Sequence, residues 1–385
     1  MLNFEFYNPV KIYFGEGQIA SLATAIPRDA RILITYGQGS IKKNGVYDQV
    51  KTALKDYPHV WEFEGIEPNP KYETLMKAVT LARQHQVDFL LAVGGGSIID
   101  GTKFIAAAVP FTGEPWDILE KQATITQALS FGSVLTLPAT GSEMNSGAVI
   151  SRESTGDKLV FMNPLVFPKF AVLDPTTTYT LPDRQTANGI IDTFVHVMEQ
   201  YLTYPVQAAL QDRFSESILL TLIEEAPKVM REPANYAARA NIMWCATLGL
   251  NGLIGAGVPQ DWATHMLGHE VTALCGLDHA QTLAVIMPSV MRVCRKQKEE
   301  KILQYGERIF GIRSGSLDER IELAITKTRD FFSGLGVKTQ LRDYGIDASA
   351  IPKLLAQLKR HQLTALGEHE KIGLSESELI YRDCL

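Results

Sequence analysis

Short apolar runs alternate with helical patterns through the first half of the chain, and this alternation constrains the fold most. The helical stretches, such as 72–86 and 98–108, carry apolar residues at three- and four-residue spacing. Strands that are apolar along their whole length are buried on both faces, and helices cover those faces in α/β proteins. We therefore predict a parallel sheet built from crossover units. The predicted strands are 31–36, 59–64, 88–93, 133–139 and 170–174.

The pattern changes near residue 180, after the proline- and threonine-rich stretch DPTTTYTLP. From there amphipathic segments follow one another without a comparable strand pattern. A chain of 385 residues is also longer than one core normally supports, so two domains are expected. We predict an α/β domain over residues 1–180 and an all-helical domain over 181–385. Its expected helices include 206–228, 236–255, 260–274, 279–297, 317–335 and 351–362.

Composition narrows the class of protein. The net charge is −6 with no basic block, which disfavours nucleic acid and anionic membranes as partners. The amino terminus lacks the layout of a signal peptide, and no apolar stretch is long enough to cross a bilayer. Four widely spaced cysteines without a CxxC pair favour reduced thiols. We expect a soluble cytoplasmic protein.

A glycine-rich loop follows the predicted strand in DFLLAVGGGSIIDGTK. Gly94, Gly95 and Gly96 allow close approach to the backbone, and a helix starting near Ser97 offers N–H groups to an anion. A pyrophosphate suits this arrangement, although it is neither the G-x-G-x-x-G fingerprint nor a Walker loop. The alternative is a tight turn without a ligand. Asp100 is either a helix-dipole acid or a cofactor or substrate contact.

Two further loops follow predicted strands and are expected at the same edge of the sheet. LTLPATGSEMNSG (135–147) is rich in hydroxyl groups, which suit ribose and amide contacts. TYGQGS (35–40) would lie near an adenosine ribose, and it holds no acid that would repel a 2′-phosphate, while Lys42 and Lys43 follow. This loop therefore predicts NADP(H) rather than NAD(H), unless it is a plain turn.

Histidines gather in the second half. Asp192 and His196 are four residues apart, as are His265 and His269, and His279 follows after a short turn. Such spacing stacks side chains on one helix face. One carboxylate with three imidazoles suits Fe²⁺ or Zn²⁺, which leaves one histidine as a neighbouring acid–base group. Core or surface roles are the alternative for each histidine taken singly.

At this point the chain resembles the iron-dependent (group III) alcohol dehydrogenases, and most of all their butanol-dehydrogenase branch of NADPH-dependent aldehyde reductases. The resemblance covers nearly the whole chain and implies a homodimer with a dehydroquinate-synthase-like architecture: a dinucleotide-binding α/β domain and an all-helical catalytic domain. The matching motifs are GIEPNP (65–70), AVGGGSIIDGTK (92–103), TLPATGSE (136–143), NGIIDTFVHVMEQ (188–200) and HMLGHEVTALCGLDHAQ (265–281).

The resemblance also implies residue roles. His269 and Asp100 would be catalytic, with His269 close to metal, nicotinamide and substrate. Ala280 stands where many relatives carry glycine, which fits the aldehyde-reductase branch. The implied metal ligands are Asp192, His196, His265 and His279. The expected cofactor contacts are Gly37, Gly39, Ser40, Asn69, Gly94, Gly95, Gly96, Ser97, Asp100, Thr136, Thr140, Ser142, Lys158 and Leu181.

The predicted function is metal-dependent hydride transfer from NADPH to short- or medium-chain aldehydes, in a cleft between the domains. A dehydroquinate-synthase-like lyase would need basic residues near the metal to bind a phosphorylated substrate, and the helix with His265 and His269 carries little positive charge. A glycerol-type polyol dehydrogenase is a closer rival. A non-enzymatic metal-binding protein would not need both the glycine loop and the histidines.

Overall fold

A computed structural model describes residues 1–385, which form two compact units. The α/β unit comprises Tyr7–Leu181 and Pro233–Thr247, and the helical unit comprises Met1–Phe6, Pro182–Glu232 and Leu248–Leu385. An α/β fold followed by a helical region confirms the predicted fold class. The domain boundary between residues 180 and 181 is still a prediction.

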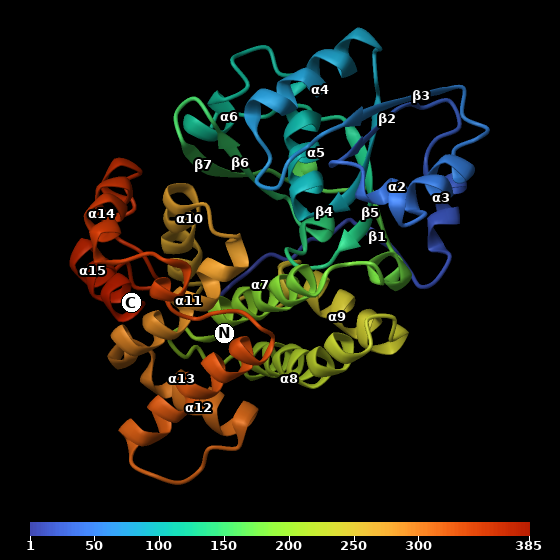
Figure 1. The fold of residues 1–385 in the computed structure, drawn as a ribbon. Helices are drawn as coiled ribbons and strands as arrows, with labels where there is room; N and C mark the ends of the chain where they lie inside the picture. The colour runs from blue at the N-terminus through green and yellow to red at the C-terminus, as the bar shows by residue number, and fades with distance from the viewer. The chain divides into compact units, whose positions relative to one another are not determined.

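A six-stranded parallel sheet forms the centre of the α/β unit, in the order β1-β8-β5-β4-β2-β3. Figure 1 labels β1, β2, β3, β4 and β5 of this sheet together with α4 and α5. Alternate residues of β2 enter opposite cores: Leu33 joins one hydrophobic cluster, and Ile32 and Ile34 join the other. Burial on both faces explains why the central strands read as continuous apolar runs. The strands are β1 Lys11–Phe14, β2 Arg31–Tyr36, β3 His59–Glu64, β4 Phe89–Gly95, β5 Ser130–Leu137 and β8 Phe170–Leu173.

Three strands of this unit were not predicted. β1 is a four-residue edge strand whose terminal residues Lys11 and Phe14 are exposed, so it lacks the apolar run of a central strand. β6 (Gly147–Arg152) and β7 (Asp157–Met162) form a separate antiparallel pair. The helices are α1 Leu22–Ala25, α2 Ser40–Lys43, α3 Val46–Ala53, α4 Tyr72–Gln84, α5 Gly96–Ala108, α6 Asp117–Glu120 and most of α9 Tyr236–Gly249.

The helical unit contains no strand of the named sheets, as predicted. The helix predicted over 279–297 is instead divided at Cys294 into two helices. The buried face of the second helix begins with Lys298 and Lys301 and becomes apolar only from Ile302, so apolar spacing does not reveal where that helix starts. No helix is both long and apolar enough to cross a bilayer. The helices are α7 Asp183–Tyr201, α8 Ala209–Arg231, α10 Ala263–Cys275, α11 His279–Val293, α12 Arg295–Phe310, α13 Leu317–Gly334, α14 Ile351–Arg360 and α15 Leu374–Asp383.

Candidate functional site

The carboxylate of Asp192 is surrounded by imidazoles. Its Oδ1 lies 3.6 Å from Nδ1 of His196 and 3.7 Å from Nε2 of both His265 and His279. α7 supplies Asp192 and His196 one turn apart, α10 supplies His265, and His279 is the first residue of α11. α7 and the consecutive helices α10 and α11, more than 60 residues further along the chain, therefore bring the four predicted ligands together.

The donor atoms of this cluster fit a divalent metal. One ligand atom each from Asp192, His265 and His279 lies within 4.8 Å of the others. Asp192 Oδ1 and His265 Nε2 are buried without a hydrogen-bond partner, which is costly unless a ligand satisfies them. A carboxylate with imidazoles suits Fe²⁺ or Zn²⁺. His196 stacks on His265 with ring centroids 4.5 Å apart, and its role as a fourth ligand is still a prediction.

Electrostatics keep Asp192 anionic. Burial acts to raise its pKa, but the imidazoles of His196, His265 and His279 together hold that pKa well below its usual range. Burial acts to lower the pKa of His265, and the carboxylates of Glu199 and Asp192 outweigh it and raise the pKa to about 9. A cation at Nε2 of His265 would therefore compete with a proton.

Glu199 is a residue that the sequence argument missed. Nδ1 of His265 donates a hydrogen bond to Oε2 of Glu199. Oε1 of Glu199 accepts from the backbone N–H groups of Thr264 at 2.6 Å and His265 at 3.3 Å. A buried carboxylate bonded in this way fixes the ring orientation of a metal-binding histidine. Glu199 follows Asp192 and His196 at i+7 and i+3 on α7, and this spacing was the available signal.

His269 lies beside the cluster. Its ring centroid is 6.3 Å from that of His265 and 5.0 Å from that of His279. It is partly exposed, whereas His265 is buried. This place suits a group that exchanges protons with substrate or water, and the catalytic role of His269 is still a prediction.

The glycine-rich loop joins β4 to α5 without space for side chains. A Cβ atom at Gly94 would lie 2.4 Å from Ile98, and one at Gly96 would lie 2.4 Å from Oγ1 of Thr140. The loops after β4 and β5 therefore touch, as expected for two parts of one binding edge. Close packing explains these glycines even without a ligand, and the pyrophosphate role is still a prediction. Among the other predicted contacts, Gly95 ends β4, Thr136 lies within β5, and Leu181 is the last residue before the helical unit.

Asp100 belongs to a buried hydrogen-bond network. Oδ1 accepts from Oγ of Ser142 at 2.5 Å, and Oδ2 accepts from the backbone N–H of Val149 at 2.9 Å. Burial raises the pKa of Asp100 although Lys103 opposes this shift. Two protein donors already occupy the carboxylate, which favours Asp100 as a group that holds the loop in place. A direct contact with cofactor is still a prediction.

Lys103 is the centre of this network and was not singled out from the sequence. Its side chain is fully buried, and Nζ donates to Ser142 Oγ at 2.8 Å, Asn145 Oδ1 at 2.8 Å and the carbonyl of Gly147 at 2.7 Å. Burial lowers the pKa of Lys103 to about 8, although Asp100 and Glu143 act to raise it. The lysine thus ties α5 to the loop after β5.

Three predicted cofactor contacts meet at one point. The backbone N–H of Asn69 donates to Ser97 Oγ at 3.4 Å, and Lys158 Nζ donates to Asn69 Oδ1 at 2.9 Å. Asn69 has a left-handed backbone with a φ of 54°, a conformation that asparagine tolerates better than most residues. The motif GIEPNP therefore lies against the glycine-rich loop, as its assignment to the cofactor requires.

The loop with Gly37, Gly39 and Ser40 has an acidic neighbour that the sequence argument overlooked. Glu64 ends β3, which pairs with β2, and its Oε1 would lie 3.1 Å from a Cβ atom at Gly39. Lys42 Nζ lies 2.7 Å from Oε2 of Glu64. The charge next to this loop is therefore a Lys42–Glu64 ion pair rather than two unopposed lysines.

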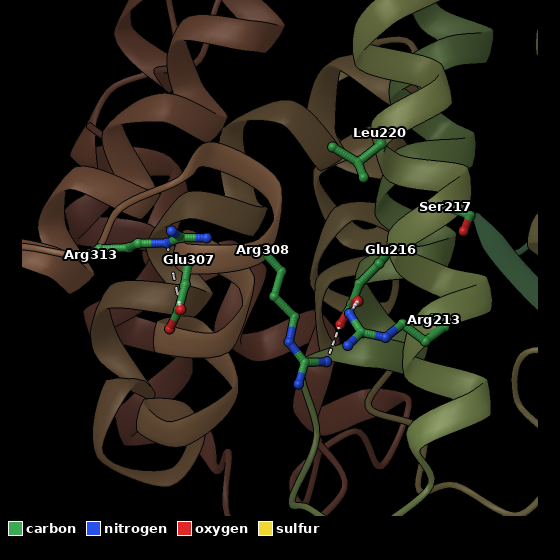
Figure 2. A pocket seen from close by; sticks show the side chains of 7 residues that line it. All are labelled: Arg213, Glu216, Ser217, Leu220, Glu307, Arg308 and Arg313. Carbon is green, nitrogen blue, oxygen red and sulfur yellow. Dashed lines mark hydrogen bonds and ion pairs between the residues drawn. The ribbon is translucent and has the colours of Figure 1, made fainter.

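A surface hollow of about 450 Å³ lies elsewhere in the helical unit, between α8 and α12. Figure 2 shows the side chains of Arg213 and Arg308 pointing toward Glu216. Nη1 of Arg213 lies 2.9 Å from Oε2 of Glu216, and Nη1 of Arg308 lies 2.6 Å from Oε1. Glu216 is buried and also accepts a hydrogen bond from Tyr201 at 2.9 Å. These groups satisfy one another, and no predicted site residue lines the hollow. The lining residues are Arg213, Glu216, Ser217, Leu220, Glu307, Arg308 and Arg313.

Comparison with known families matches both units. Residues 9–175 match the family described as iron-containing alcohol dehydrogenase. Residues 186–382 match the family described as Fe-containing alcohol dehydrogenase family, C-terminal. These two matches cover nearly the whole chain.

Individual relatives agree with the family matches. The chain is 61% identical over 384 residues to the NADPH-dependent aldehyde reductase YqhD of Escherichia coli (strain K12), covering 99% of each chain. It is 41% identical over 387 residues to the probable NADH-dependent butanol dehydrogenase 1 of Bacillus subtilis (strain 168), covering 98% of this chain and 100% of the relative. A crystal structure of YqhD from E. coli K-12 superposes with a TM-score of 0.98 at 59% identity, covering 100% of this chain and 99% of the other.

Proposed function

The chain belongs to the iron-containing alcohol dehydrogenase family, and we propose that it is an NADP(H)- and metal-dependent aldehyde reductase. Its substrates would be short- and medium-chain aldehydes, reduced to alcohols. The proposal rests on the convergence of one ligand atom each from Asp192, His265 and His279, together with the buried Asp192 Oδ1 and His265 Nε2, which have no hydrogen-bond partner. The 61% sequence identity to an NADPH-dependent aldehyde reductase, over 384 residues, supports reduction of the aldehyde as the direction of the reaction.

The relatives differ in cofactor: they include both NADPH- and NADH-dependent enzymes, so the preference of this chain depends on its own residues. Gly37, Gly39 and Ser40 bring no acid of their own to the proposed adenosine ribose. Glu64 is the nearby carboxylate, and its ion pair with Lys42 lowers the negative charge there. This arrangement supports NADPH, since an unopposed acid would repel a 2′-phosphate.

The proposed chemistry assigns a role to each residue. Asp192, His196, His265 and His279 would hold a divalent metal, which would polarise the aldehyde carbonyl, and bound NADPH would supply the hydride. Glu199 keeps the proton on Nδ1 of His265, so that Nε2 faces Asp192. His269 holds the proton that reaches the developing alkoxide, directly or through water. Asp100 and Lys103 hold the loop carrying Ser142 beside the glycine-rich loop.

We further propose Fe²⁺ or Zn²⁺ as the metal, a cytoplasmic location and a homodimer. Carboxylate and imidazole ligands accept either metal. None of the four cysteines forms a disulfide, which supports the proposed compartment. β1 is an edge strand with an exposed Phe14, and such edges need cover. Light scattering after gel filtration measures the oligomeric state.

The deciding experiment follows NADPH or NADH oxidation by absorbance with butanal, before and after chelation. We expect NADPH-selective turnover that chelation abolishes and Fe²⁺ or Zn²⁺ restores. Turnover with NADH alone would refute the NADPH preference predicted from the Gly37–Ser40 loop, while the proposed dehydrogenase activity would stand. Metal-loaded protein that oxidises neither cofactor with a panel of aldehydes would refute the reductase.

A further inference from the structure

Trp262 has a backbone conformation that bulky residues rarely adopt. It directly precedes α10 with φ 63° and ψ 2°, in the left-handed region. The other non-glycine residues with positive φ are asparagine, glutamine or glutamate, so Trp262 is the one aromatic among them. Strain of this kind persists where the surrounding structure enforces it, and it concentrates at functional sites.

The residue before Trp262 is held by a buried clamp. The backbone N–H of Asp261 donates to the carbonyl of Glu199 at 2.9 Å, and Oδ1 of Asp261 accepts from the N–H of Ala263 at 2.7 Å. The other carboxylate oxygen accepts from Nζ of Lys298. The chain on both sides of Trp262 is thereby fixed to α7 and to the start of α10.

Lys298 is itself secured from three directions. Its side chain is almost fully buried, and besides Asp261 it donates to the carbonyl of Leu202 at 2.8 Å and to Glu368 at 2.8 Å. Burial acts to lower the pKa of Lys298, but Asp261 and Glu368 outweigh it and raise that pKa. Lys298 therefore stays cationic, and the clamp keeps its charge pairing.

The indole ring that this clamp presents lies against the predicted metal ligands. Its centroid is 5.5 Å from the ring of His265 at an interplanar angle of 71°, and 6.2 Å from the ring of His196 at 62°. Nε1 donates to Oε1 of Gln260 at 2.9 Å, which fixes the indole at its polar end. Edge-to-face contact of this kind restricts the rotation of both imidazoles.

We propose that Trp262 is a positioning residue of the metal site, forced into its strained backbone by the Asp261–Lys298 clamp so that its ring holds His196 and His265 in the orientation a metal needs. Packing alone would not require a left-handed backbone at a tryptophan. The inference rests on the proposed metal site, since it concerns residues that orient the ligands of that site.

Trp262→Gly separates the ring from the backbone, because glycine adopts a left-handed conformation without strain. The measurement is Zn²⁺ affinity by competition with a chromophoric chelator on the full chain, with thermal unfolding of the metal-free protein alongside. We expect the Kd for Zn²⁺ to rise about 10-fold or more, as for other groups that orient metal ligands, with little loss of thermal stability. Trp262→Phe, which keeps an aromatic ring, should restore most of the affinity.

Gln207→Gly is the matched control, since Gln207 is exposed and has a φ of 54°. It should leave the Kd for Zn²⁺ unchanged. Lys298→Met should weaken Zn²⁺ binding through release of Asp261, and unchanged binding would overturn the clamp. Wild-type affinity in Trp262→Gly would overturn the role of Trp262. A wild-type protein that binds no Zn²⁺ in the same titration would instead overturn the proposed metal site.

Discussion

The predicted metal site and the network around Lys103 both bury charged groups, but they differ in how far those groups are hydrogen-bonded. At the cluster, Asp192 Oδ1 and His265 Nε2 lie 3.7 Å apart, and both are buried without a hydrogen-bond partner. In the α/β unit, Asp100, Lys103 and Ser142 satisfy one another at distances of 2.5–2.8 Å. Buried polar groups that converge but lack partners indicate a place for a ligand. Buried polar groups that are saturated indicate a scaffold that holds neighbouring loops.

The largest effect is expected from removing a ligand at the unsaturated cluster. His265→Ala should abolish both metal binding and aldehyde reduction, because it removes one of three converging donor atoms. Metal content of the purified protein and NADPH oxidation with butanal measure the two losses. His269→Ala is the control and should keep the metal while slowing turnover. Metal loss in His269→Ala would make His269 a ligand, and full occupancy in His265→Ala would remove His265 from the site.

A large effect on stability is expected at the saturated network. Lys103→Met leaves Asp100 and the acceptors of the loop without their buried cation, and breaking such a network costs about 3–5 kcal/mol of unfolding free energy. Urea unfolding followed by circular dichroism measures the loss. Metal affinity of the folded protein should not change, since Lys103 lies outside the helical unit. A stable Lys103→Met protein would show that the network is not a scaffold.

The same lysine predicts a pH dependence. Burial lowers the pKa of Lys103 to about 8 in the folded protein, below its value in the unfolded chain. Between these two values the unfolded state binds more protons, so the contribution of Lys103 to stability rises with pH from about 8 upward. Urea unfolding at several pH values should show this slope in the wild type and not in Lys103→Met. An equal pH dependence of the unfolding free energy in both proteins would show that Lys103 is not the group responsible.

An intermediate effect is expected at Glu199, which orients a ligand without being one. Glu199→Gln replaces the anion bonded to Nδ1 of His265 with a neutral amide. Metal affinity should fall about 10–100-fold while the fold is kept. Chelator competition gives the affinity and circular dichroism confirms folding. Unchanged affinity would show that the ring of His265 is oriented by its other neighbours alone.

The smallest effect is expected at the exposed Lys42–Glu64 pair. Lys42→Ala leaves Glu64 unopposed beside Gly39 and should lower kcat/KM for NADPH by roughly 2–5-fold, the range of an exposed ion pair. Glu64→Gln should shift the preference the other way. Steady-state kinetics with NADPH and NADH measure both ratios. An equal change in kcat/KM with NADPH and with NADH would show that the Lys42–Glu64 ion pair does not determine the cofactor preference.

The sequence predicted those features that depend on local spacing. The apolar runs of β2 and β4 predicted the sheet, and the i,i+4 pairs predicted the histidine cluster. Glu199 was also within reach, because it continues the face of α7 that carries Asp192. Glu199 orients a ligand without being one, so the expected ligand count of a metal site does not single it out.

Other features depend on contacts between distant segments. Glu64 lies beside Gly39 because β3 pairs with β2 in a register that places Glu64 opposite Tyr36. The buried face of α12 begins with Lys298 and Lys301, whose partners come from other elements, and its apolar residues start only at Ile302, so no apolar pattern marks the first turns of that helix. Charge pairing across the fold, unlike apolar periodicity, leaves no repeat in the sequence.

The pairing of β1 with β8 has a consequence for the order in which the chain folds during synthesis. Lys11 pairs with Phe170, so one edge of the sheet stays open until the ribosome has released most of the α/β unit. That unit also needs residues 233–247, which follow α7 and α8 of the helical unit in the sequence. Neither unit can be finished before the other has started, and contacts this far apart in sequence slow folding. A nascent chain halted at residue 181 should therefore be a better client for chaperones than the complete protein.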